Sequence, residues 1–533
     1  MVSASRFSIV AASALAVLLG VQPVLAEKSG GILKAYHRGT PPSGSIHEEA
    51  TNSTVSPYAG VYNNLIMYDQ HKPKNSLETI VPELAKSWSW NADKTQLTFK
   101  LREGVKWHDG KPFTSADVKC TWELVLGQTG KRKLRKNPRK AWYKNLDKIT
   151  TNGDYEATFH MKRPQLAFVA LLASGYSPVY PCHVSPKKMR TNPIGTGPYK
   201  FVELKQNEHV KFTRNENYWR PNRPFLDGIE WTIIKSRSTR VLAFIAGQFD
   251  LTFNVDVTVP LLKDVMAKAP DSVCELRTTN VSMNLIVNQD KPPFDNAQIR
   301  KAMVLTLDRK AFIDILSAGA NVMGGAMMPP PAGVWGMPPE VLRNVAGFGP
   351  DVKKNREEAR AIMRKLGYGP DNPLKLKVST RNVAVYRDGA VILIDHLKHI
   401  YMQAELEPVE TSNWFGKVAR KDYAIGLNFT GSGVDDPDAH FYENYSCGSQ
   451  RNYTGYCNKE LEKLFAEQSM ETDVEKRKKL VWAIDKRLQE DAARPIIMHT
   501  KGATCWKPSV KGFTTMMNSL YNGWRMEDVW LDR

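Results

Sequence analysis

Apolar and polar residues alternate along this chain in patterns that predict short strands followed by amphipathic helices. The clearest unit lies near the middle, where an apolar run over 283–288 precedes the segment Lys-Pro-Pro-Phe-Asp-Asn at 291–296. Proline is excluded from sheet interiors, so the strand should end before Pro292. Asp295 and Gln298 match a capping box, which predicts that a helix starts here. The apolar face of that helix is formed by Ile299, Ala302, Met303 and Thr306.

The same succession recurs on both sides of this unit. Leu97, Phe99 and Leu101 alternate with polar residues as in a half-buried strand, and 374–378 is a second such strand, followed by a helix over 390–401. The apolar stretch 494–499 is expected to carry the chain back to its first part. A chain of 533 residues exceeds what one hydrophobic core normally serves. We therefore predict an α/β protein of two lobes, joined by two chain crossings, with a cleft that closes about a hinge.

Residues 1–26 have the composition of a secretory signal peptide. Arg6 is their only charge, 9–21 is nearly all apolar, and small residues precede a cleavage site before Glu27. The apolar run is short for a membrane anchor, and no later stretch reaches about 18 apolar residues. We expect a soluble mature protein in the periplasm.

The positive charge of the chain is partly local. The formal net charge is +19, and eight lysines and arginines fall within 131–144. An exported protein rarely meets nucleic acid, so no nucleic-acid partner is expected. The simplest interpretation of this basic segment is a solvated face, and the alternative is contact with anionic lipid headgroups or an acidic partner.

Six cysteines in an exported chain predict up to three disulfides. Cys447 and Cys457 flank a short polar loop that a bridge would close, so we expect this pair to be bonded. The partners of the other four remain open: Cys120, Cys182, Cys274 and Cys505. Their spacing does not resemble a zinc site, and neither a metal nor a cofactor is expected.

Several ordered motifs carry a family resemblance. They are Asn284–Asn288, Pro293–Asn296, Ile299–Ala302, Leu307–Arg309, the segment 97–118 and Pro193–Tyr199. Together they resemble the extracytoplasmic solute-binding proteins of peptide and nickel ABC importers, solute-binding family 5. The resemblance implies a periplasmic-binding-protein-like α/β fold of the class II type. It also implies a receptor, not an enzyme, that captures a peptide or peptide-like small molecule and delivers it to an ABC permease in the inner membrane, and we expect it to be a monomer.

The first lobe is expected to be enlarged by an inserted subdomain. We assign 1–26 to the signal peptide, 27–74 with 192–287 and 500–533 to the core of lobe I, 75–191 to the inserted subdomain, and 288–499 to lobe II.

Two other functional classes compete with the receptor. A secreted hydrolase lacks support because the chain has no H-E-x-x-H or G-x-S-x-G motif and no nucleophile paired with a base. Dispersed carboxylates leave a glycosidase-like pair open. The third class is an envelope structural or chaperone-like protein, which the basic segment favours. Lobe closure by a ligand without turnover would separate the receptor from both.

Four residues are candidates for ligand contacts, and no catalytic residue is assigned. Arg381 follows the strand over 374–380, and its guanidinium can bind a ligand carboxylate through two hydrogen bonds. Trp414 is a candidate wall of the pocket. Asp435 and Asp436 lie in a glycine-rich acidic loop after another strand, where open α/β folds place ligands. A solvated turn is the alternative for Arg381, and core packing is the alternative for Trp414.

The acidic loop departs from the pattern of the peptide receptors it resembles. Those receptors often hold the ligand's amino group with an aspartate in this loop. Alignment on Asp436-Pro437-Asp438 puts Ser432 or Gly433 at the usual anchor position, and Asp435 substitutes for it only if the loop shifts. The departure argues against a simple dipeptide ligand.

Overall fold

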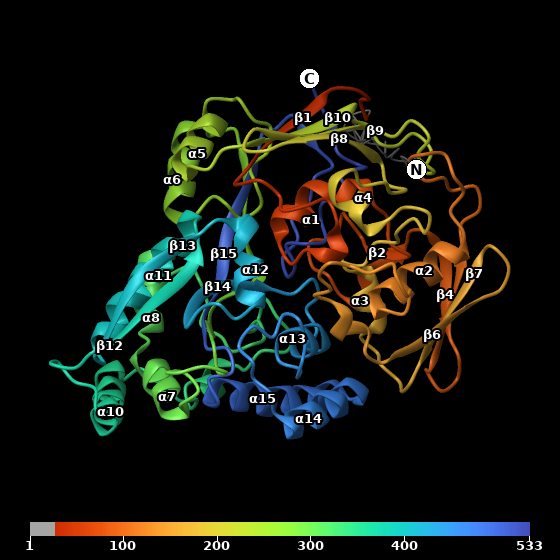
Figure 1. Ribbon diagram of the computed structural model, residues 1–533. Helices are drawn as coiled ribbons and strands as arrows, with labels where there is room; N and C mark the ends of the chain where they lie inside the picture. Colours follow the sequence, from red (N-terminus) through yellow and green to blue (C-terminus); the bar gives the residue numbers. More distant parts are fainter. Residues whose placement is uncertain (1–26) are drawn as a thin grey trace, which may run out of the picture.

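The computed structural model describes residues 27–533 (Figure 1). The predicted signal peptide, residues 1–26, lies outside the described residues. None of the helices in 27–533 is both long and apolar enough to cross a membrane.

Lobe I is built on a four-stranded sheet of order β1-β10-β9-β8. β1 pairs in parallel with β10, and the other pairs are antiparallel. Helices α5 and α6 lie at one end of this sheet in Figure 1, and α1 lies below it. The bounds are β1 Ile32–His37, α1 Asn52–Tyr58, β2 Ile66–Tyr68, β3 Ile80–Pro82, β8 Tyr199–Lys205, β9 His209–Arg214, β10 Gly228–Ile233, α5 Arg237–Ile245 and α6 Val259–Lys268.

An antiparallel sheet of order β4-β5-β7-β6 extends lobe I, on the right of Figure 1. Leu97, Phe99 and Leu101 point into its core, which confirms the alternation predicted for this strand. Helix α2 covers the sheet, and its Trp122 packs edge-to-face on Phe159. The bounds are β4 Ala85–Trp90, β5 Gln96–Leu101, α2 Ser115–Leu126, β6 Leu146–Thr151, β7 Glu156–Met161, α3 Phe168–Ala173 and α4 Pro186–Thr191.

Lobe II contains a five-stranded mixed sheet of order β13-β12-β14-β11-β15. β12 is parallel to β13 and β14, and β11 is antiparallel to β14 and β15. The bounds of its strands are β11 Val273–Val287, β12 Leu374–Arg381, β13 Met402–Val409, β14 Ile425–Gly431 and β15 Ile496–Trp506. Its helices are α7 Ala297–Thr306, α8 Arg309–Ser317, α9 Pro339–Leu342, α10 Val352–Lys365, α11 Ala384–Lys398, α12 Thr411–Ala419, α13 Pro437–Asn444, α14 Lys459–Met470 and α15 Val474–Glu490.

The two long strands β11 and β15 run through both lobes. Val273–Thr278 pairs with Lys501–Trp506 beside lobe I, and the register then shifts before Ser282 pairs with His499. β14 joins β11 from Val281 onward, at the lobe II end of this shift. The hydrophobic cores on the two sides are separate clusters. The shift at 278–282 therefore lies where one lobe can turn relative to the other. After β15, the chain ends in lobe I with β16 Val510–Lys511 and β17 Trp530–Leu531.

The central strand-corner-helix unit forms with one difference. β11 ends at Val287, before the two prolines, and Ile299, Ala302, Met303 and Thr306 are buried as predicted. The N-cap residue is Asn296 rather than Asp295, because the Asn296 side chain accepts a hydrogen bond from the Gln298 amide at 2.8 Å. The capping box predicted for Asp295 and Gln298 is therefore wrong, and the helix is capped by Asn296 alone.

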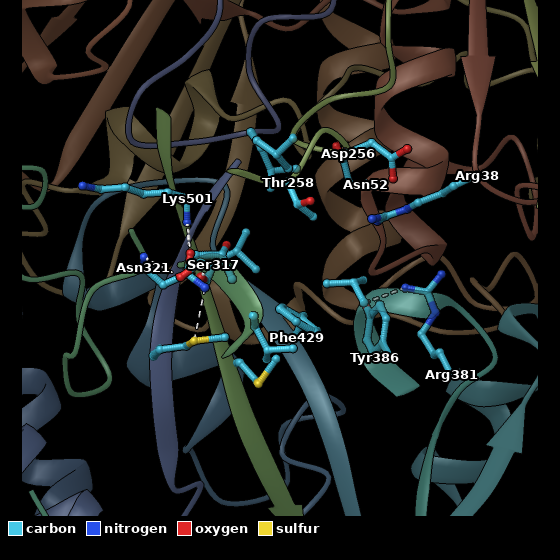
Figure 2. A pocket seen from close by; sticks show the side chains of 18 of the residues that line it. Arg38, Asn52, Asp256, Thr258, Ser317, Asn321, Arg381, Tyr386, Phe429 and Lys501 are labelled. Carbon is cyan, nitrogen blue, oxygen red and sulfur yellow. Dashed lines mark hydrogen bonds between the residues drawn. The ribbon is translucent and has the colours of Figure 1, made fainter. Parts of the chain in front are cut away.

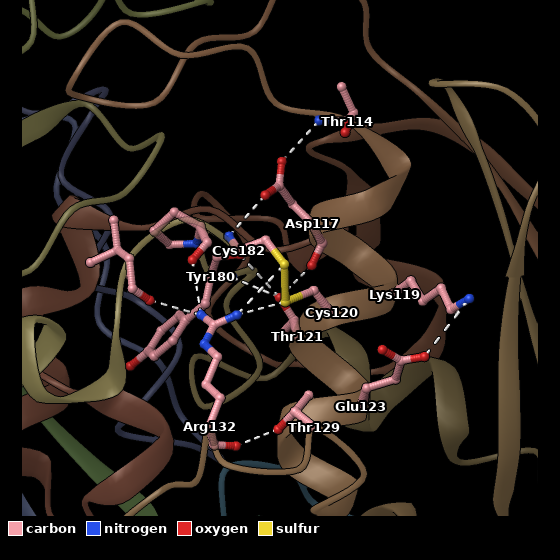
Figure 3. Close-up of a disulfide and its surroundings, with 12 residues drawn as sticks. Thr114, Asp117, Lys119, Cys120, Thr121, Glu123, Thr129, Arg132, Tyr180 and Cys182 are labelled. Carbon is pink, nitrogen blue, oxygen red and sulfur yellow. Dashed lines mark hydrogen bonds and ion pairs between the residues drawn. A yellow bond between two sulfur atoms is a disulfide. The ribbon is translucent and has the colours of Figure 1, made fainter.

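The six cysteines form three disulfides: Cys120–Cys182, Cys274–Cys505 and Cys447–Cys457. The second joins β11 to β15 at directly paired positions. Figure 3 shows the first, beside which Arg132 of the basic segment is anchored. Its guanidinium donates to the carbonyls of Pro181 and Val184, at 3.0 and 2.8 Å.

The second half of the basic segment packs between the two lobes and does not form a solvated face. Arg139, Trp142 and Tyr143 are buried. The Trp142 indole donates to the Ala439 carbonyl of α13 at 3.0 Å. Lysines 131, 133, 140 and 144 remain exposed. The expected solvated face is therefore limited to a subset of this segment.

Candidate ligand-binding site

A cavity lies between the two lobes, beside the crossing strands (Figure 2). It holds about 1010 Å³ of space that no atom occupies, including solvent at its mouth. Residues of lobe I, of lobe II and of β11 and β15 all line it. Its lining includes Arg38, Asn52 and Asp256 from lobe I, Ser317, Arg381, Tyr386 and Phe429 from lobe II, and Met283, Met498 and Lys501 from the crossing strands.

Arg381 is the last residue of β12 and lines this cavity. Its guanidinium donates to the Tyr386 hydroxyl at 2.8 Å and to Thr411 Oγ1 at 2.9 Å. It also lies over the Tyr386 ring, 4.8 Å from the centroid. Only 3% of the residue is exposed, and it forms no ion pair within residues 27–533. The side chain is thus held in place by neutral groups, with its charge uncompensated.

Arg38 lines the same cavity from lobe I, directly after β1. Its guanidinium lies over the Phe253 ring, 4.9 Å from the centroid. Its Nε is buried, and within the described chain that atom has no hydrogen-bond partner. Burial lowers the pKa of Arg38, the Tyr386 hydroxyl raises it, and the charge of Arg381 lowers it further. Figure 2 shows Arg38 of lobe I reaching toward Tyr386 of lobe II, whose hydroxyl accepts a hydrogen bond from Arg381 of the same lobe.

Arg38 was not predicted from the sequence, although it shares with Arg381 the position at the end of a strand. Arg38 directly follows β1, and Arg381 is the last residue of β12. The residue before Arg38, His37, is fully buried. Burial lowers the pKa of His37 to about 3, so it is a neutral core residue.

Two other charged residues of the cavity, Asp256 and Arg237, have ion-pair partners, whereas Lys501 forms no ion pair among the described residues. Buried Arg240 holds the Asp256 carboxylate through two hydrogen bonds of 2.8 and 2.9 Å. Arg237 reaches Asp388 of lobe II at 3.7 Å. Among the described residues that line the cavity, four are basic and one is acidic, and that acid is neutralised by an arginine behind it. The cavity therefore has an excess of positive charge.

The floor of the cavity is apolar. Its lining side chains include Val281, Met283, Leu316, Phe415, Phe429 and Met498. Trp414, the predicted wall, is fully buried in α12 and packs in a core cluster with Ile286, Val418, Tyr423 and Tyr453. Its neighbour Phe415 lines the cavity, whereas Trp414 does not.

The two candidate acids lie away from this cavity. Asp436 is the N-cap of α13, and its carboxylate pairs with Arg477 through two hydrogen bonds of 2.8 and 2.9 Å. Asp435 is partly exposed, but its carboxylate oxygens are buried, and this burial, with the nearby charge of Asp436, raises its pKa to about 7. Asn518 and the Val334 amide offset part of the rise in its pKa, although neither reaches hydrogen-bond geometry with the carboxylate.

The glycine-rich loop of lobe II is pressed against lobe I. The Gly433 carbonyl accepts hydrogen bonds from Ser519 Oγ at 3.2 Å and from Asn522 Nδ2 at 2.9 Å. A Cβ at Gly433 would lie 2.2 Å from Ser174 Oγ, and the Tyr176 ring would also be close, at 3.0 Å. The lobes are therefore in direct contact here, and no carboxylate of this loop lines the cavity.

Comparison with known proteins decides the family. Residues 79–452 match the model of the bacterial extracellular solute-binding proteins, family 5. The chain belongs to this family. The heme-binding protein A of Haemophilus influenzae is 26% identical over 491 residues, covering 85% of this chain and 84% of its own length. The dipeptide-binding protein of Escherichia coli is 24% identical over 489 residues, covering 85% of this chain and 86% of its own.

The fold of this family-5 protein is shared with solved structures. The Haemophilus influenzae OppA complex with the peptide RPPGFSPFR has a TM-score of 0.83 and 21% identity, and the match covers 95% of this chain and 99% of the other. The predicted periplasmic-binding-protein-like α/β fold with two lobes is confirmed. These two relatives are binding proteins by name.

Proposed function

We propose that this family-5 protein is the substrate-binding component of an ABC importer. It captures a peptide or peptide-like solute between its lobes and presents it to a permease in the inner membrane. The observation that carries the proposal is the cavity to which both lobes and both crossing strands contribute. A ligand held there touches both lobes at once and therefore favours the closed form by its differential affinity.

Arg381 is the ligand contact we propose to retain from the four predicted residues. Its guanidinium faces the cavity, is oriented by Tyr386 and Thr411, and lacks an acidic partner in the described chain. It is therefore placed to bind a ligand carboxylate. For Trp414, Asp435 and Asp436 we propose an indirect part, because they support α12 and α13 beneath the cleft.

The remaining parts of the proposal follow from export and from the receptor role. Residues 1–26 direct the chain to the periplasm and are removed. The core of lobe I consists of 27–74, 192–287 and 500–533, with 75–191 inserted, and lobe II is 288–499, except that the end of β11, 283–287, packs in the core of lobe II. The mature protein acts as a monomer. It performs no catalysis, because a receptor must release its solute unchanged.

The proposal is tested by screening solutes against the mature protein. Thermal-shift measurements with dipeptides, oligopeptides, N-blocked peptides, sugars and metal chelates should identify a stabilising class, since a bound ligand stabilises the fold with the logarithm of its saturation. The stabilising compound should then be recovered unmodified by mass spectrometry. A compound that is consumed would point to an enzyme.

A further inference from the structure

We propose that the cleft selects a peptide-like ligand with two anionic groups, one bound by Arg38 of lobe I and the other by Arg381 of lobe II. This inference rests on the proposed receptor function and names its substrate class. The ligand neutralises two arginines that closure brings together, and in this way it controls closure.

The first step is that both arginines belong to one cavity but to different lobes. Arg38 follows β1, and Arg381 ends β12. Tyr386 connects them, because its hydroxyl accepts a hydrogen bond from Arg381 and Arg38 points toward it in Figure 2. Opening of the lobes moves the two guanidiniums apart, and closure brings them together.

The second step is that neither charge is compensated by the protein. Neither arginine forms an ion pair in residues 27–533. The acids that could serve are already engaged, Asp256 by Arg240 and Asp388 by Arg237. Two like charges repel more strongly as water leaves the space between them. The closed cleft without an anion is therefore electrostatically unfavourable.

The third step concerns the rest of the ligand. The apolar floor, with Met283, Phe429 and Met498, suits an apolar body. Asp256 is the one acid that the described lining offers to a ligand ammonium group, and its carboxylate already accepts two hydrogen bonds from Arg240. The ligand class is thus an N-blocked, peptide-like dicarboxylate rather than a zwitterionic dipeptide.

The lobe equilibrium without ligand tests the electrostatic part. Spin labels on the two lobes report the interlobe distance by pulsed electron paramagnetic resonance spectroscopy. Arg38→Gln should raise the closed fraction of the ligand-free protein, and so should high ionic strength in the wild type, because both weaken the repulsion. Arg38→Gln combined with Arg381→Gln should add little further. The control is Arg364→Gln on exposed α10, which bonds only Tyr401. An unchanged closed fraction in Arg38→Gln would overturn the proposal.

Calorimetry with three matched probes tests the ligand class. N-acetyl-Ala-Glu carries two carboxylates, N-acetyl-Ala-Gln carries one, and Ala-Glu adds an ammonium group. The first should bind at least about tenfold more tightly than either of the others, and Arg38→Gln should abolish its advantage over N-acetyl-Ala-Gln while leaving the melting temperature unchanged. Equal binding of the first two probes, or an advantage that survives in Arg38→Gln, would overturn the proposal.

The two levels of the account fail in different ways. If neutral or zwitterionic peptides close the lobes while Arg38→Gln changes nothing, the receptor function stands and the dianion inference is wrong. If no solute of any class closes the lobes, the receptor function itself is wrong.

Discussion

Arg139 and Glu443 face each other across the two lobes, with Arg139 Nε 3.8 Å from Glu443 Oε1 and each side chain 1% exposed. Arg139 belongs to the buried part of the basic segment, and Glu443 belongs to α13. Glu443 also accepts a hydrogen bond from buried Arg451. One carboxylate therefore compensates two guanidiniums at the lobe interface, and its removal leaves buried positive charge without a partner.

Replacement of Glu443 should consequently destabilise the protein strongly. We expect Glu443→Gln to lower the free energy of unfolding by about 3–5 kcal/mol, measured by urea denaturation. The control is Glu460→Gln on α14. Glu460 forms an ion pair with Lys463 in which both side chains are exposed, so this substitution should lower the free energy of unfolding by less than about 1 kcal/mol. Equal effects of the two substitutions would show that the interlobe pair does not contribute in this way.

Replacement of Arg381 should weaken binding without affecting folding. A ligand carboxylate left unpaired in a closed cleft costs roughly 2–5 kcal/mol, so Arg381→Ala should weaken affinity at least about thirtyfold. Calorimetry with the identified solute measures this loss. Arg420→Ala, an exposed arginine at the end of α12, is the control and should bind normally. Normal affinity in Arg381→Ala would remove this residue from the site.

Asp435 should make the protein less stable as the pH rises. Its folded pKa of about 7 lies above its ordinary 3.8, so the folded state favours the protonated acid. The cost is absent below about pH 4, grows between pH 4 and 7, and is complete above pH 7. Asp435→Asn should therefore raise the free energy of unfolding at pH 8, by up to about 4 kcal/mol.

The same variant supplies its own control. At pH 4 both forms are nearly uncharged at this position, so the difference between variant and wild type should almost vanish. A difference that is constant from pH 4 to pH 8 would mean that Asp435 is ionised in the folded protein at ordinary pH.

The exposed lysines of the basic segment should not affect ligand binding. No residue of 131–144 lines the cavity described here. Reversal of Lys131, Lys133, Lys140 and Lys144 to glutamate should leave the affinity within about threefold, a change under about 0.7 kcal/mol. A hundredfold loss in calorimetry would place the ligand site elsewhere.

Local patterns predicted much of the fold, and long-range contacts explain what they missed. The strands around Leu97 and Val378 followed from alternation alone. Cys447 and Cys457 are ten residues apart, so their proximity could be expected from a short loop. The other disulfides span 62 and 231 residues and depend on tertiary structure, such as the register that places Cys274 opposite Cys505.

The lining of the cavity was predicted in part for the same reason. A polar residue at a strand end is visible in the sequence, and Arg381, which was predicted on that ground, lines the cavity. Whether a tryptophan lines a cleft depends on the orientation of its helix, and α12 turns Phe415 rather than Trp414 toward the cavity. The ion pair of Asp436 with Arg477 joins residues 41 positions apart, and no local pattern indicates it.

The central claim is that a solute closes the two lobes and leaves unchanged. Its most direct test is the interlobe distance during titration of the mature protein with the stabilising solute, combined with mass spectrometry of the solute afterwards. The account predicts a saturable shift from a long to a short distance and full recovery of unmodified solute. A distance that does not change at saturating solute, or a solute that is chemically altered, would contradict it.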